Sequence, residues 1–396
     1  MLSAPFVVLA RFLVILGPAL NLAAGTMQGM SRENSSHDGS AGRPAAQQRA
    51  RPPRRVRWGA VVALMLLSPF CAEYLIGYQG VITDPFGMLV AVLMVLPIYG
   101  APAVLIREFV RRTGRGWPTM LLLAAAAGLI QAGLIDQSLF NHDLYGGTPE
   151  LRIPGLDVDA GELLTYIGGH IVWSFGAPIA VIESCLPAAA QGATPARLPA
   201  RPGDPRVAEE DPRIQPWLEI LGLIVVAVIY GAGAIFYYYQ LVVAVGFAIR
   251  PMQLIAVLVV TGLLVGTAIR WPGRGRSTGA VMSPMILGTV VCLLALGFVL
   301  LDDVLGRIGF GLRLLVVVVA IMVLTGCSRR SGWHSGHVLA AASAALLVYT
   351  AVAFWVNPEN VARSTLYVAR GVVAVGMVAL LGFAAWRRVG VDRSRS

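Results

Sequence analysis

The stretches WPTMLLLAAAAGLIQAGLIDQ, residues 117–137, and LLTYIGGHIVWSFGAPIAVIESCLPA, residues 163–188, are two long apolar runs separated by a polar loop. About 20 apolar residues in a helix span the roughly 30 Å hydrocarbon core of a bilayer, and each run is at least that long. Hydrophobic residues make up 57% of the 396-residue chain and charged residues only 13%, a composition that a water-soluble surface cannot accommodate. The sequence therefore predicts an all-α, polytopic integral membrane protein.

The same length criterion predicts about ten membrane-spanning helices after Arg57. They are Trp58–Tyr78, Pro85–Ile106, Trp117–Gln137, Leu163–Ala188, Trp217–Tyr237, Met252–Trp271, Gly279–Leu301, Gly309–Gly326, Ser335–Val356 and Thr365–Trp386. The stretch Gln240–Arg250 is apolar but short, and we expect it to form an outer loop or a re-entrant piece.

The distribution of polar residues divides the chain into segments. We interpret these as an extra apolar N-terminal segment (1–29), a disordered Arg-rich cytoplasmic tail (30–57), a four-helix unit with a polar site (58–188), a cytoplasmic linker (189–215), a six-helix apolar scaffold (216–388) and a cytoplasmic tail (389–396). Translation of the first segment is in doubt, because Met27 and Met30 offer later starts.

Arginine placement predicts the orientation. All 31 basic residues are Arg, and they cluster in every second loop, as at Arg107, Arg111 and Arg112. By the positive-inside rule these loops face the cytoplasm, which places both termini there. An Arg-only chain indicates a GC-rich genome, so we expect a bacterial plasma-membrane protein. Its net charge of +10 should face lipid headgroups rather than nucleic acid, and the sequence does not identify its protein partners.

Neither a metal site nor a disulfide framework is indicated. The four cysteines lie in or beside apolar runs without CxxC spacing, which is typical of small packing residues; they are Cys71, Cys185, Cys292 and Cys327. No HExxH or comparable ligand spacing occurs. We expect no metal and no cofactor.

The candidate ligand or proton site comes from the depth of polar side chains within the predicted spans. Glu73, Gln131 and His170 each lie about five to seven residues from an outer helix end, or roughly 7–11 Å below the boundary at 1.5 Å per residue. Ionisable groups at such depth need a partner, a cavity or a function. The other members of this predicted site lie beside these three: Asp136 and Ser174, with Tyr166 and His142 as accessory residues. A structural hydrogen-bond cluster that locks the helices together is the alternative.

A second polar set lies at the predicted inner boundary and comprises Arg107, Glu108, Arg112 and Glu183. Opposite charges at helix ends commonly form salt bridges. We interpret this set as structural.

A possible internal sequence repeat relates the helices of the four-helix unit. Tyr99-Gly100-Ala101-Pro102 in the second predicted helix matches Phe175-Gly176-Ala177-Pro178 in the fourth, and Trp58 to Glu73 mirrors Trp117 to Gln131 to within one residue. A duplicated helical hairpin would explain both matches. Chance is the alternative, because Gly, Ala and Pro are common in membrane helices.

Two short motifs, Arg107-Glu108-Phe109-Val110-Arg111-Arg112 and His170-Ile171-Val172-Trp173-Ser174, resemble the CAAX-protease and bacteriocin-processing (CPBP) family of intramembrane peptidases. Only Glu108, Arg112 and His170 match that family's pattern, which covers about a third of the chain. The resemblance implies a hydrolase that uses these residues. However, the predicted depths separate Glu108 from His170 by roughly 15–20 Å, whereas a catalytic pair must come within about 3 Å or share one water. More broadly, the chain resembles uncharacterised bacterial multi-spanning membrane proteins.

Three functions follow from these patterns. A carrier of an ion or small molecule would use the predicted outward-facing polar site for proton coupling, and this is the hypothesis that we prefer. An intramembrane hydrolase would need a nucleophile or an activated water beside His170. A structural or assembly protein would need no chemistry at all.

Overall fold

The computed structural model describes residues 53–77, 80–142, 151–186, 215–271, 277–301, 306–358 and 361–393. The predicted N-terminal segment, nearly all of the Arg-rich tail and almost the whole linker lie outside these ranges, as does the end of the C-terminal tail.

The elements follow one another as helices with one small hairpin. They are α2 (Arg54–Pro69) continued by η1 (Phe70–Tyr74), η2 (Gly80–Thr83), α3 (Pro85–Arg112), α4 (Trp117–Ile130) continued by η3 (Gln131–Ile135), β1 (Arg152–Ile153) paired antiparallel with β2 (Val158–Asp159), α5 (Ala160–Gly169) continued by η5 (His170–Gly176) and α6 (Ala177–Cys185), α7 (Ile220–Tyr238) continued by η8 (Tyr239–Val243), α8 (Pro251–Arg270), α9 (Pro284–Leu300), α10 (Arg307–Ser328), α11 (Ser335–Val352) and α12 (Arg363–Arg393).

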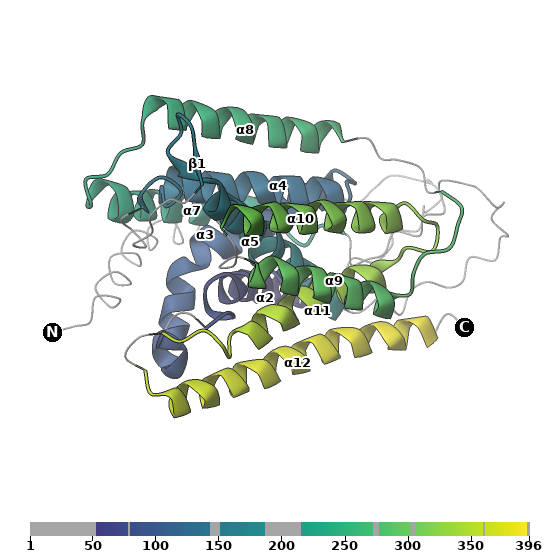
Figure 1. Cartoon of the computed structure of the whole chain (residues 1–396). Helices are drawn as coiled ribbons and strands as arrows, with labels where there is room; N and C mark the ends of the chain where they lie inside the picture. Colours follow the sequence, from purple (N-terminus) through teal and green to yellow (C-terminus); the bar gives the residue numbers. More distant parts are fainter. Residues whose placement is uncertain are drawn as a thin grey trace, which may run out of the picture.

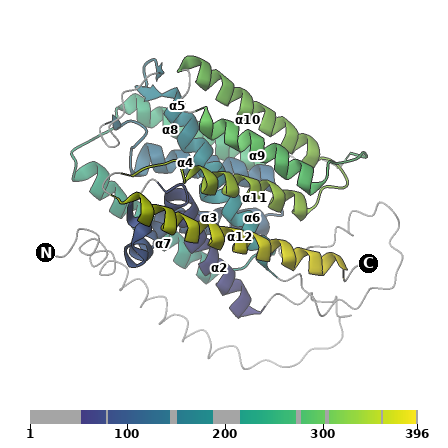
Figure 2. The same ribbon diagram turned by 60° about the horizontal axis from the view of Figure 1, so that its bottom comes forward.

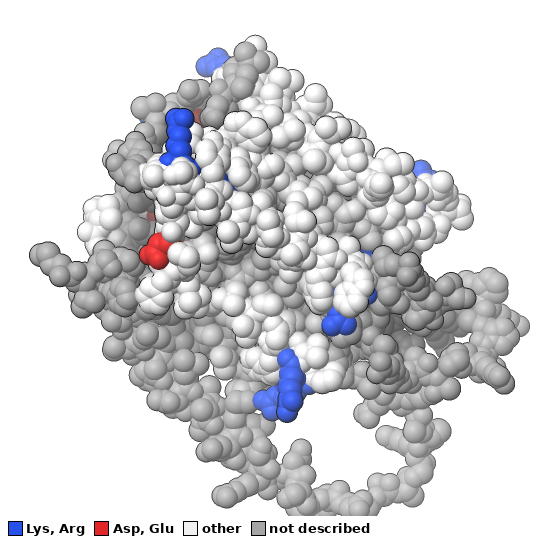
Figure 3. Space-filling model, turned by 90° about the horizontal axis from the view of Figure 1, so that it is seen from below, with Lys and Arg blue, Asp and Glu red and all other residues white. Residues whose placement is uncertain are grey.

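The predicted fold class is confirmed. Nine helices within the described ranges are long and apolar enough to cross a membrane, and α9, the tenth apolar helix there, is shorter at 17 residues. Figure 3 shows a broad uncharged face, with arginine and acidic side chains toward its edges. Such a surface suits the hydrocarbon of a bilayer.

The helices pack as a bundle with α8 and α12 on opposite faces (Figure 1). On one side of the bundle α10, α9, α11 and α12 lie side by side in that order (Figure 2). On the other side α8 packs on α4, and α7 packs on α3. The continuous α5–η5–α6 span lies between these groups and contacts α2, α4, α11 and α12. Two buried apolar clusters meet on this central span, one through Phe175 and Ile179, the other through Trp173 and Val181.

The four-helix unit carries most of the interior. The spans formed by α3, α4 and α5–α6 are largely buried, whereas α7, α8, α10 and α12 present most of their apolar side chains outward. Outward apolar side chains are expected on helices that face lipid.

Several predicted helix boundaries differ from the observed ones; α3, for example, ends at Arg112 rather than Ile106, and α9 begins at Pro284 rather than Gly279. The first helix begins at Arg54 rather than Trp58, and Arg57 is buried because its Nη1 donates to the carbonyl of Trp217 at 3.1 Å. The helix expected from Trp217 instead begins at Ile220 and runs through η8 to Val243. Its start is displaced because the backbone N–H of Trp217 donates to Glu108 at 2.8 Å. The extension of the helix to Val243 takes up the first part of the stretch expected to form an outer loop.

The cysteines are all free thiols, and Cys71 and Cys327 are buried. Cys71 belongs to an apolar cluster. This position agrees with a packing role.

Candidate functional site

Predicted site residues coincide with π-helical turns. Glu73 lies in η1, Gln131 begins η3, and His170 and Ser174 both lie in η5. A π turn holds one residue more than an α turn, disturbs the regular backbone ladder, and occurs frequently at functional sites. Three of the four spans in the polar unit therefore change helical geometry at their polar side chains.

Proline and serine account for part of the irregular backbone in η5. Pro178 has no N–H, so the carbonyl of Ser174 lacks its usual helical donor. The hydroxyl of Ser68 on α2 lies 2.5 Å from that carbonyl oxygen and 3.1 Å from the carbonyl oxygen of Tyr99 on α3. Ser68 is fully buried. One hydroxyl thus joins three helices at the level of the polar side chains.

Tyr99 connects Glu73 to His170. Its hydroxyl donates to Oε1 of Glu73. Its ring stacks on the imidazole of His170 with centroids 5.7 Å apart, and the ring of Phe175 lies 6.0 Å from the same imidazole. Glu73 is also close enough to His170 for their charges to interact. The structure therefore brings Glu73 and His170 together, with Tyr99 between them.

Gly128 on α4 makes room for His170. A Cβ at position 128 would lie 2.6 Å from Cβ and 2.9 Å from Cγ of His170. Real Cβ atoms do not approach that closely. The absence of a side chain at Gly128 therefore lets α4 pack directly on the histidine.

Hydrogen bonding fixes the tautomer of neutral His170. Its Nδ1 lies 2.7 Å from the carbonyl oxygen of Tyr166, and a carbonyl can only accept, so Nδ1 carries the hydrogen. In the neutral ring Nε2 is then an acceptor. Nε2 is buried and has no hydrogen-bond partner among the described residues, and the whole residue is 9% exposed. A buried, unpaired acceptor is costly unless something occupies it.

Asp136 closes the helix that contains Gln131. The backbone N–H of Ser138 donates to its Oδ1 at 2.9 Å. Burial raises the pKa of Asp136 to about 6; the Ser138 hydrogen bond opposes this rise, and the charge of Glu73 adds to it. The next residue, Gln137, has a φ of 55°, in the left-handed region. Through this turn the chain folds back, and Gln137, Ser138 and Asn141 are buried.

Three further polar residues lie between the cluster and the loop that precedes α5: Tyr166, His142 and Glu162. Tyr166 is one turn from His170 and lies in electrostatic range of Asp136 and Glu162. His142 lies farther out, with Nε2 3.0 Å from the carbonyl oxygen of Asp157 and Nδ1 3.8 Å from Glu162. His142 thus contacts the loop that precedes α5.

The second polar set forms a buried ion-pair network. Arg107 and Glu108 are 0% exposed. Arg107 donates to Glu183 at 3.0 Å and to Glu108 at 2.7 Å, and its guanidinium lies 3.6 Å from the ring centroid of Trp217. Arg111 binds both oxygens of Glu183, at 2.8 and 2.6 Å.

Glu108 accepts from the start of the α7 segment as well as from arginine. The backbone N–H groups of Trp217 and Leu218 donate to it at 2.8 and 3.2 Å, and Arg112 lies 3.4 Å away. Arg112 also donates to the carbonyl of Leu218 at 2.5 Å. These contacts join α3 to the chain before α7.

The two polar sets are separate. Tyr99 and Glu108 are nine residues apart on α3, which corresponds to about 13 Å along a helix, and His170 stacks on Tyr99. His170 and Glu108 therefore do not share the geometry of a catalytic pair.

Sequence reasoning missed several aromatic members of the site. Tyr99 was recognised only as part of a repeated motif. Tyr237, within the predicted apolar scaffold, lies in electrostatic range of Glu73 and Tyr74. Its one signal was the run Phe236-Tyr237-Tyr238-Tyr239.

The two glycines of the proposed hairpin repeat have different surroundings. A Cβ at Gly100 would clash with the carbonyl oxygen of Met65 on α2. A Cβ at Gly176 would first meet the carbonyl oxygen of Ile171 in its own span, at 2.6 Å, and then the side chain of Leu121 on α4, at 3.4 Å. The duplication itself stays a hypothesis.

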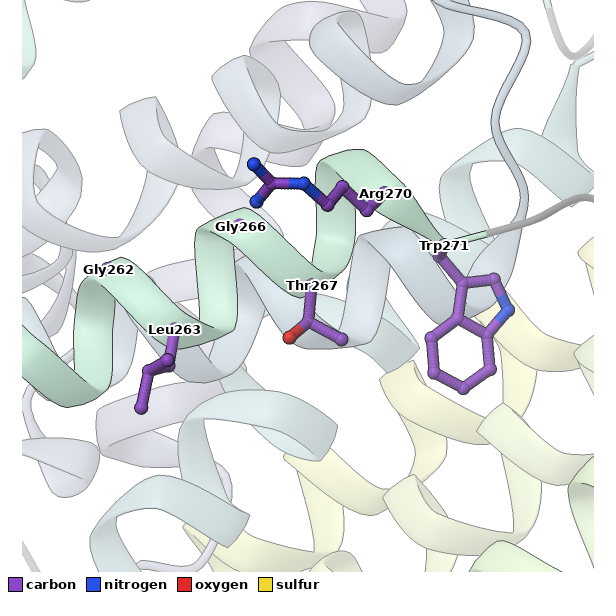
Figure 4. Close-up of a pocket in the computed structure, with 6 residues that line it drawn as sticks. All are labelled: Gly262, Leu263, Gly266, Thr267, Arg270 and Trp271. Atoms are coloured by element: carbon purple, nitrogen blue, oxygen red, sulfur yellow. The ribbon is translucent and has the colours of Figure 1, made fainter.

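A surface hollow is lined by residues that belong to neither polar set. It runs along one helix, and Figure 4 shows Arg270 and Trp271 at the end of that helix; its lining is Gly262, Leu263, Gly266, Thr267, Arg270 and Trp271. Within the described part of the chain, no three His, Cys, Asp or Glu side chains gather as metal ligands.

Residues 62–389 match the model of a family described as an uncharacterized membrane protein family. The chain belongs to this family. The match includes both polar sets and runs from within α2 to the end region of α12. No curated protein and no solved structure matches the chain. These comparisons give no support to the CPBP resemblance, in agreement with the separation of Glu108 from His170.

Proposed function

We propose that this membrane protein is a proton-coupled carrier of a small molecule or ion, and that its site is the cluster of Glu73, Asp136, His170 and Tyr99. One observation carries the proposal: the acid and histidine side chains of this cluster lie where three spanning helices adopt π turns. Discontinuous helices and ionisable groups together are characteristic of transporter sites.

Proton coupling needs a group that titrates near physiological pH. The pKa of Asp136, just beyond the end of its spanning helix, is raised to about 6, mainly by burial. Asp136 interacts electrostatically with Glu73, so a proton or cation at one carboxylate changes the energy of the other. The cluster can therefore exchange a proton for another charge.

A carrier also needs helices that bend, because the site must open. The π turns of η1, η3 and η5 provide irregular backbone, and Pro97, Pro102 and Pro178 lie within spanning helices. Proline and π turns are recognised causes of helix kinks. Gln131, His170 and Ser174 are buried, as the closed conformation of such a carrier would require.

The network around Arg107 and Glu108 supplies a fixed base for this motion. Its charges are paired with one another and with backbone groups, whereas Nε2 of His170 is unpaired. We therefore expect the Glu73 side of the four-helix unit to move relative to the Arg107 side.

The test is a pH-step experiment on purified protein reconstituted in liposomes on a solid-supported membrane. We expect a transient current after the step that is reduced at least tenfold in Glu73→Gln and His170→Gln. Glu219→Gln is the matched control, since Glu219 is 70% exposed and its carboxylate pairs with Arg57 at 3.5 Å. Equal currents in all four proteins, with all four folded, would reject the carrier and favour a structural protein.

A further inference from the structure

The polar cluster contains two carboxylates. Glu73 and Asp136 interact with each other, and Glu162 lies one turn beyond Tyr166. Buried Arg313 donates to Thr165 and to the carbonyl of Phe298, at 2.7 and 3.1 Å.

Arg370 is another buried arginine, and its Nη2 donates to the carbonyls of Gly77 and Val356. Its Nε and Nη1 are buried without a hydrogen-bond partner among the described residues. Asp136 and His170 each interact electrostatically with Glu73. The cluster is therefore suited to a cation rather than an anion.

Aromatic side chains lie near Glu73 and His170. Tyr99 and Phe175 flank His170, and Tyr74 and Tyr237 lie in electrostatic range of Glu73. The faces of aromatic rings attract organic cations, most strongly where water is excluded. A bare metal ion would prefer more oxygen ligands and fewer rings.

The unpaired Nε2 of His170 specifies the ligand further. This atom is an acceptor in the neutral ring, since Nδ1 donates to Tyr166. It is buried and has no partner. A ligand that satisfies it must carry an N–H or O–H donor. A quaternary ammonium ion has no such donor, whereas ammonium and guanidinium groups do.

We propose that the cluster binds a small organic cation that carries N–H donors, with Glu73 and Asp136 as counter-charges, Nε2 of His170 as hydrogen-bond acceptor and Tyr99 as an aromatic wall. This inference names the substrate class of the proposed carrier, and the claim that the cation is transported rests on that proposed function. Binding itself requires only the geometry of the cluster.

Guanidinium is a suitable probe because it remains charged at all accessible pH values and so does not cross lipid as a neutral base. The unfolding temperature of the purified full chain in detergent is measured at low millimolar guanidinium, well below denaturing concentrations. Tetramethylammonium is the control for charge without N–H donors, and sodium acetate is the control for ionic strength and for an anion. A ligand that binds the folded state raises this temperature in a saturable way.

We expect saturable stabilisation by guanidinium, with a half-saturating concentration at least tenfold lower than for tetramethylammonium. Glu73→Gln should raise the guanidinium value at least tenfold, and Glu219→Gln should leave it unchanged. If Glu73→Gln does not fold, Asp136→Asn replaces it, with the same expectation. No saturable effect, an equal effect of tetramethylammonium, or an unchanged value in the folded site variant would overturn the inference.

The two proposals fail in different ways. Guanidinium binding that depends on Glu73, without any pH-step current, would reject the carrier and keep the ligand class. A pH-step current that depends on Glu73, without guanidinium binding, would keep the carrier and reject the ligand class.

Discussion

Replacement of Gly128 by alanine tests the packing that positions His170. The new Cβ would lie 2.6 Å from Cβ and 2.9 Å from Cγ of the histidine. Neither atom is the far end of a flexible side chain, so α4 and η5 must separate. Overpacking of this kind typically costs about 1–3 kcal/mol. The higher helix propensity of alanine offsets up to about 1 kcal/mol of that cost.

Gly169→Ala is the matched control, because a Cβ at Gly169 meets nothing within 4 Å. It adds the same methyl group one residue before His170, and it gains the helix propensity without the clash. The control should therefore be as stable as wild type or slightly more so. Gly128→Ala should be less stable by a net of about 0.5–2 kcal/mol, after the propensity gain is subtracted.

The assay is thermal unfolding in detergent, followed by intrinsic tryptophan fluorescence, together with the pH-step current. One kcal/mol corresponds to roughly 2–4 °C for a domain of 150–250 residues, so we expect a decrease of a few degrees for Gly128→Ala only. Its current should fall as well, because the His170 ring is displaced from Tyr99. Equal unfolding temperatures and equal currents for the two alanine variants would refute the close packing on which the site depends.

Three further predictions concern charge and orientation. The pKa of Asp136 is raised from 3.8 to about 6, so the folded state holds this proton more tightly than the unfolded state. The resulting stabilisation of the folded state amounts to about 3 kcal/mol; it is complete below about pH 4 and is lost as the pH rises to about 6. Asp136→Asn should therefore flatten the decline in unfolding temperature between these pH values. An unchanged decline would contradict the assignment. Glu108→Gln removes one of the two carboxylates that pair with buried Arg107 and should lower stability by about 3 kcal/mol. Glu219→Gln should cost less than about 1 kcal/mol, and similar unfolding temperatures for the two variants would show that the network is not structural. A reporter fused after Arg152 should read outside and one after Arg206 cytoplasmic, and a cytoplasmic signal at Arg152 would reverse the predicted topology.

The fold class was predictable because hydropathy and span length are properties of single segments. Helix ends were less so, since tertiary contacts decide them. The late start of α7 follows from the backbone hydrogen bonds that Trp217 and Leu218 donate to Glu108, a residue 109 positions away from Trp217. No local pattern encodes such a partner.

The site was partly predictable for a similar reason. Depth along the helix placed Glu73 and His170 at one level, and the structure brings them together through Tyr99. Depth gives no direction around the helix axis, so it could not select Tyr99 or Tyr237. The π turns also went unpredicted, because the residues that form them, such as Gln131 and Ile135, have no distinctive composition.

The separation of the two polar sets was predictable from depth alone. Glu108 and Glu183 lie with Arg107, whereas Glu73 lies with Tyr99. Chain order would have suggested one continuous site from residue 117 to residue 183. Position along the bilayer normal is thus a stronger predictor here than proximity in sequence.

The most direct test of the account is the coupling of cation movement to proton movement. Liposomes that contain the purified protein and an entrapped pH indicator receive an inward guanidinium gradient at equal internal and external pH. We predict proton efflux, seen as an alkaline shift inside, in wild type and in Glu219→Gln, and at least a tenfold lower rate in Glu73→Gln. No proton movement in wild type, or the same rate in folded Glu73→Gln, would contradict the claim that this cluster is a proton-coupled cation site.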